Sequence, residues 1–140
     1  MASVIYNIYK KSIRDGDLDL AADTIKVALV TSSYTVDIDA HLDFADITNE
    51  ISGTGYTAGG ATLTTKTVTQ DDTNNRGVFD ADDVTWAVAT FTARGAVVYQ
   101  DTGTPATSIL MFYIDFAEDK SPSEEDFTIT WASTGIEYGA

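Results

Sequence analysis

Short segments in which apolar and polar residues alternate, separated by turn-forming residues, dominate this chain of 140 residues. In the clearest segment, Phe127, Ile129 and Trp131 share one face and Thr128 and Thr130 share the other. This spacing is typical of a strand with one side against a core. Alternation with period two, repeated along the chain, predicts strands rather than helices.

Other segments extend this pattern. Val84, Trp86 and Val88 repeat the alternation, and both tryptophans, Trp86 and Trp131, are therefore expected in the core. Residues 25–30 and 109–116 are apolar on nearly both faces, which predicts strands that are covered on both sides. The remaining predicted strands are residues 61–69, 78–80, 91–100 and 136–138.

Clusters of turn-forming residues fall between the predicted strands, at 71–75, 101–103 and 121–123. The pattern predicts about seven or eight strands in an all-β domain, a β-sandwich or a jelly-roll-like fold. We expect residues 17–140 to form this single domain, because its length suits one hydrophobic core.

The N-terminal residues 1–16 lack this alternation and predict a short helix or arm. Their apolar residues recur at intervals that suit one face of a helix ending near Gly16, namely Val4 or Ile5, Ile8, Tyr9 and Ile13. This helix either packs on its own domain or reaches a neighbouring subunit as an arm.

Residues 32–60 form a second irregular region, too long for an ordinary connection. A helical turn is predicted at 40–47, and the glycine-rich run 52–60 follows it. Tyr34 and Tyr56 are expected to be exposed there, and the loop is either a binding surface or a flexible surface excursion.

The composition limits the partners of the chain. There are 22 acidic and eight basic residues, which give a formal net charge of -14, so nucleic acid and anionic membranes are not expected partners. Because the chain has no cysteine, its stability must come from packing. The N-terminus does not resemble a signal peptide, and no segment is apolar enough to predict a membrane span.

The sequence predicts no catalytic, cofactor-binding or metal site, and we expect the protein not to be an enzyme. His41 is the single histidine and is interpreted as a solvated loop residue. The glycines at 53 and 55 lack the strand and helix that a dinucleotide site needs. Residues 72–83 approach a calcium loop, but Arg76 takes the place of an oxygen ligand, so a turn is the better interpretation.

Several stretches, in this order, resemble small virion proteins that tailed phages encode among their head genes. These are DTIKVALVTSSY (23–34), GTGYTAGGATL (53–63), FDADDVTW (79–86), TARGAVVYQDTG (92–103), YIDF (113–116) and FTITW (127–131). The resemblance implies a capsid decoration, or cement, protein. Such a protein is a β-sandwich that binds the major capsid protein on the virion exterior, often as a homotrimer. Ala117 and Asp126 stand where similar chains have glycine.

The candidate contacts with the capsid or a neighbouring subunit are Val4, Ile5, Ile8, Tyr9, Thr54 and Tyr56. We further hypothesise that removal of residues 2–14 leaves a folded domain that no longer attaches. Two alternatives remain open: a virion protein of the tail or neck, and a carbohydrate-binding β-sandwich whose aromatic residues stack on sugars.

Overall fold

The computed structural model describes residues 2–139, which contain ten strands, one α-helix and two short 3-10 helices. In chain order the elements are β1 (Ala2–Ile5), α1 (Asn7–Asp15), β2 (Ile25–Val30), η1 (Phe44–Asp46), β3 (Ala61–Thr62), β4 (Thr67–Asp71), β5 (Arg76–Asp80), β6 (Val84–Ala89), β7 (Ala93–Gln100), η2 (Pro105–Thr107), β8 (Leu110–Lys120), β9 (Glu125–Ile129) and β10 (Glu137–Gly139). The predicted all-β class is confirmed.

The central layer is an antiparallel sheet of five strands in the order β1-β8-β7-β2-β3. Its inner strands are buried on both faces. In β2, Ile25, Val27 and Leu29 pack into a core on one side, whereas Ala28 and Val30 pack into a second cluster on the other. The predicted double-sided burial of residues 25–30 is therefore confirmed.

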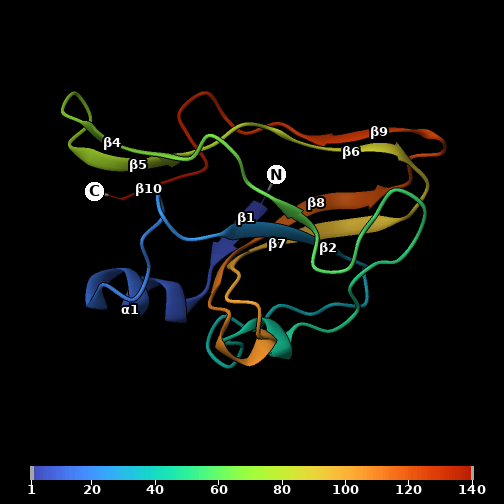
Figure 1. Ribbon diagram of the computed structural model, residues 1–140, viewed down its shortest axis with the longest axis horizontal. Helices are drawn as coiled ribbons and strands as arrows, with labels where there is room; N and C mark the ends of the chain where they lie inside the picture. The colour runs from blue at the N-terminus through green and yellow to red at the C-terminus, as the bar shows by residue number, and fades with distance from the viewer. Residues whose placement is uncertain (1, 140) are drawn as a thin grey trace.

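Two smaller antiparallel sheets cover one face of the central sheet. Their orders are β10-β5-β4 and β6-β9, and in Figure 1 they lie at opposite ends of a second layer. Trp86 and Ile129 from this layer join Val98 and Met111 from the central sheet in the larger core. The result is a sandwich-like fold whose second layer is divided in two.

The irregular segment 31–49 covers the other face of the central sheet. Tyr34 is only 6% exposed and packs with Tyr6 and Tyr113. Phe44 stacks on Tyr99 with ring centroids 4.1 Å apart. The predicted helical turn is present as η1, but the expected exposure of Tyr34 is wrong, because this segment supplies the second hydrophobic cluster with side chains.

The N-terminal helix prediction is partly confirmed. Helix α1 ends at Gly16, whose φ of 80° is in the left-handed region that glycine favours at a helix C-terminus. Residues 2–5, however, pair with β8 as a strand. The helix also packs on its own domain, since Tyr9 is 4% exposed and lies edge-on against Phe112.

Two strand predictions need correction. The expected strand at 61–69 is divided into β3 and β4, which belong to different sheets. In β6, the pairing with β9 shifts between Trp86 and Ala89, so Ala89 is buried and Val88 is 61% exposed. A β-bulge of this kind breaks strict alternation, because an extra residue is inserted into one strand.

Ala117 has a φ of 68°, a conformation that costs a residue with a Cβ atom about 1–2 kcal/mol. This exposed residue stands where the resemblance predicts glycine. Replacing it with glycine removes that cost, and the added entropy of the unfolded chain offsets only part of the gain. We expect Ala117→Gly to raise the free energy of unfolding by about 0.5–1 kcal/mol, measured by urea denaturation.

The matched control is Ala87→Gly, an exposed strand residue outside the left-handed region. We expect it to lower stability by about 0.5–1 kcal/mol, because glycine weakens a strand. Equal effects of the two changes would contradict the interpretation.

Candidate functional site

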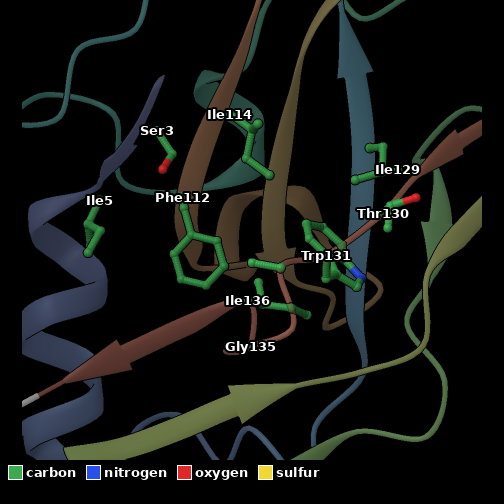
Figure 2. Close-up of a pocket in the computed structure, with 10 residues that line it drawn as sticks. Ser3, Ile5, Phe112, Ile114, Ile129, Thr130, Trp131, Gly135 and Ile136 are labelled. Atoms are coloured by element: carbon green, nitrogen blue, oxygen red, sulfur yellow. The ribbon is translucent and has the colours of Figure 1, made fainter. Parts of the chain in front are cut away.

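An apolar groove of about 310 Å³ lies beside β1. Figure 2 shows Ser3 and Ile5 on one side of the groove, Phe112 between, and Trp131 and Ile136 across from them. Ile114, Ile129, Thr130, Ala132 and Gly135 complete its lining. Three segments that are distant in sequence therefore meet here: β1, the middle of β8, and the chain from the end of β9 to β10.

The backbone of β1 is the open edge of the central sheet. Tyr6 donates its N–H to the Met111 carbonyl oxygen at 3.1 Å, and the β1–β8 register continues from this pair. Because hydrogen bonding alternates along an antiparallel pair, Val4 faces β8 and the N–H and C=O groups of Ser3 and Ile5 point outward. No residue in the described range 2–139 is hydrogen-bonded to these outward groups.

The surroundings of β1 hold it in place. Arg94 donates to the Asp115 carboxylate at 3.1 Å, and Asp115 is opposite Ala2 in the strand register. At the other end, the hydroxyl of Tyr9 donates to Glu137 at 2.9 Å and joins α1 to β10. Neither contact involves a residue that lines the groove.

The groove carries no charge, since none of its ten lining residues is ionisable. The stretch 2–14 contains three of the eight basic residues of the chain and no acidic residue. The stretch itself therefore has an excess of basic residues. Carboxylates from outside it still accept bonds from its side chains: Asp15 from Lys11, Asp39 from Asn7 and Glu137 from Tyr9.

The predicted contact residues of the N-terminal stretch differ in how deeply they are buried. Val4 is 37% exposed on the edge strand, and Ile5 lines the groove. Ile8 is half-buried against the second hydrophobic cluster, and Tyr9 is buried in the larger core. Since removal of residues 2–14 also takes away the fully buried Tyr6 and strand β1, the hypothesis that the truncated chain stays folded is not supported.

Thr54 and Tyr56 lie away from the groove. Thr54 is exposed and bridges to Thr90, whereas Tyr56 is half-buried beside Trp86. The Tyr56 hydroxyl donates to Glu50 at 2.5 Å and accepts the Leu29 N–H. Burial, and next the bond to Glu50, raise the pKa of this phenol above its ordinary range. Tyr56 is a structural residue rather than the exposed aromatic that was expected.

Other sequence candidates also find structural explanations. The Tyr34 hydroxyl shares hydrogen bonds with Tyr6 and with Nδ1 of His41, so His41 is not the solvated loop residue that was expected. Asp71 accepts bonds from Asn74 and Arg76 in the β4–β5 turn, which supports the turn interpretation of that stretch.

Within residues 2–139, no three or more His, Asp or Glu side chains are placed to hold a metal ion. The one helix of this range is too short to span a bilayer. Comparison with protein-family models, curated proteins and solved structures finds no match to the chain.

Tyr56→Phe tests the structural interpretation of that residue. The change leaves the Leu29 N–H and the Glu50 carboxylate without this partner. We expect the free energy of unfolding to fall by about 1–3 kcal/mol, measured by thermal and urea denaturation. The exposed neighbour Thr57 provides the control, since Thr57→Ala is expected to change it by less than about 0.5 kcal/mol.

The carboxyl group beside β1 predicts a pH dependence. The Ala117 N–H, and next Arg94, hold the pKa of Asp115 below its ordinary value. A depressed pKa stabilises the fold above the unfolded pKa of about 3.9, and the contribution is lost as the pH falls through the folded value. We expect Asp115→Asn to be less stable than the parent at pH 7. The difference between the two proteins should shrink as the pH falls through the folded pKa of Asp115, and a difference that stays constant across the acid range would contradict this assignment.

Proposed function

We propose that the chain is a structural virion protein that attaches to the outer surface of a tailed-phage capsid and joins neighbouring capsid subunits. The observation that carries the proposal is the uncharged groove beside the open edge of β1. A concave apolar surface of this kind suits the side chains of a protein segment, because apolar area on both partners is then removed from water.

The distribution of charge supports an exterior position. A net charge of -14 disfavours contact with packaged nucleic acid, whereas the groove itself is neutral. The partner that fits is a loop or arm of the major capsid protein with apolar side chains. The resemblance to virion head proteins adds support from the sequence.

Attachment of this kind works through many weak contacts. A groove of about 310 Å³ holds only a few side chains, so one copy alone binds weakly. Copies that associate with one another bind the capsid lattice at several points, and the overall affinity rises without new contacts. Association of copies with one another, which the resemblance also implies, therefore belongs to the same proposed function.

Ala132→Arg tests the groove. Ala132 is exposed and lines the groove, so a long charged side chain there obstructs docking without disturbing the core. We expect at least about a tenfold loss of affinity for capsids assembled without this protein, measured by co-sedimentation at increasing protein concentration.

Ser133→Arg is the matched control, because Ser133 is exposed, adjacent in sequence and outside the groove. It adds the same charge and should leave binding within about twofold of the parent. If the parent protein does not co-sediment with capsids at all, the proposal falls.

The position in the particle separates this proposal from its main alternative. Electron microscopy of particles with a labelled full-length chain should show the label over the whole head. A label confined to the neck or tail would replace capsid decoration by the tail-associated function.

A further inference from the structure

We infer that β1 pairs with β1 of a second copy across a two-fold axis, and that this contact forms a dimer. The inference concerns self-association, which goes beyond attachment to a capsid and does not depend on it. It rests on the direction of the free backbone groups of β1, on the exposed Val4 and on the local charge.

The free groups of β1 are arranged symmetrically about Val4. Ser3 and Ile5 direct their N–H and C=O groups away from β8, one on each side of Val4. In an antiparallel pair centred on Val4, Ser3 lies opposite Ile5 of the second copy, and Ile5 opposite its Ser3. Both pairs are then hydrogen-bonded, which gives roughly four hydrogen bonds.

Val4 is the residue at the axis of this arrangement. It is one of only four large hydrophobic residues classed as exposed in the described range. At a position between two hydrogen-bonded pairs, strands approach most closely, with Cα atoms about 4.5 Å apart. The two Val4 side chains would therefore cover one another.

The other outer strands of the sheets carry features that oppose pairing. Strand β3 has two residues, and β6 contains the bulge at Val88. Carboxylates occur in β4 (Asp71), β9 (Glu125) and β10 (Glu137). Charges, bulges and short length protect edges from association. Strand β1, with the sequence ASVI, has no charge, proline or bulge.

Local charge also favours a second copy at this edge. Two chains of net charge -14 repel one another in general. Residues 2–14, however, contain Lys10, Lys11 and Arg14 and no carboxylate. Lys11 is paired with Asp15, and Asp115, opposite Ala2, is paired with Arg94. The β1 edge itself carries no charged side chain, so it adds no repulsion of its own to a contact between two copies.

The pairing has a structural consequence for the groove. A two-fold axis perpendicular to an antiparallel sheet places the same face of both copies on the same side. Because Ser3 and Ile5 line the groove as well as the edge, the two grooves become neighbours in one trough. Two-fold pairing also predicts dimers, rather than the trimers that the family resemblance implies.

Cysteine cross-linking of the full-length chain tests this inference directly. The natural chain has no cysteine, so Val4→Cys introduces a single thiol at the proposed axis. A Cα separation of about 4.5 Å allows a disulfide. We expect mild oxidation to convert most of Val4→Cys to a covalent dimer on a non-reducing gel. The control Val68→Cys, an exposed residue of β4, should stay largely monomeric.

Analytical ultracentrifugation provides the second measurement. Because the contact is small, the parent protein should be monomeric at micromolar concentration and dimeric toward millimolar concentration. Val4→Arg places two cations at the axis and should raise the dissociation constant by about tenfold or more, whereas Val68→Arg should not change it. Circular dichroism tests whether each variant is folded. If Val4→Arg does not fold, the cross-linking of Val4→Cys decides whether β1 pairs with a second copy.

Equal cross-linking of the two cysteine variants would overturn the inference. So would a parent protein that forms only trimers, or that stays monomeric toward millimolar concentration. These results leave capsid attachment untouched, because co-sedimentation measures that function separately. Conversely, a protein that dimerises through β1 but does not bind capsids would contradict the proposed function and support the edge pairing.

Discussion

Burial of the central sheet on both faces is the constraint on which the rest of the structure depends. Strands β2, β7 and β8 direct apolar side chains to both sides of the sheet. Exposure of either face to water is therefore unfavourable. One face is covered by the two small sheets. The other is covered by the irregular segment 31–49, whose Tyr34 and Phe44 pack on the sheet. This explains why a long segment with little regular structure is well packed: its side chains complete a core.

The same constraint explains which parts of the fold were predictable from sequence. Residues 25–30 are apolar at every position except Lys26, and that composition alone indicates a strand between two layers. The exposure of Val88 was not predictable, because a bulge depends on pairing with β9 and not on the residues of β6. The burial of Tyr34 was not predictable for a related reason. The sequence of a loop indicates that its backbone is irregular. It does not indicate that the loop packs on an apolar face of a sheet.

The candidate site shows a sharper limit. The apolar intervals predict Val4 and Ile5 on one face of a helix, yet both residues belong to a strand. Intervals of three to five residues also fit a strand followed by a helix. The opposite wall, Trp131 and Ile136, is more than one hundred residues away in sequence. Trp131 was expected in the core, and nothing in the local pattern of either wall signals that they meet. The groove exists because β1 pairs with β8, which is a long-range contact.

An unpaired strand edge beside an apolar groove is a surface that favours association. The net charge of -14 opposes nonspecific association between copies. Strand β1 itself carries no charged side chain. The proposed contacts there would be weak for a single copy and stronger when many copies are held on a lattice. The proposed pairing uses the backbone of this edge, whereas the proposed attachment uses the adjacent groove, so both would involve one region of the molecule.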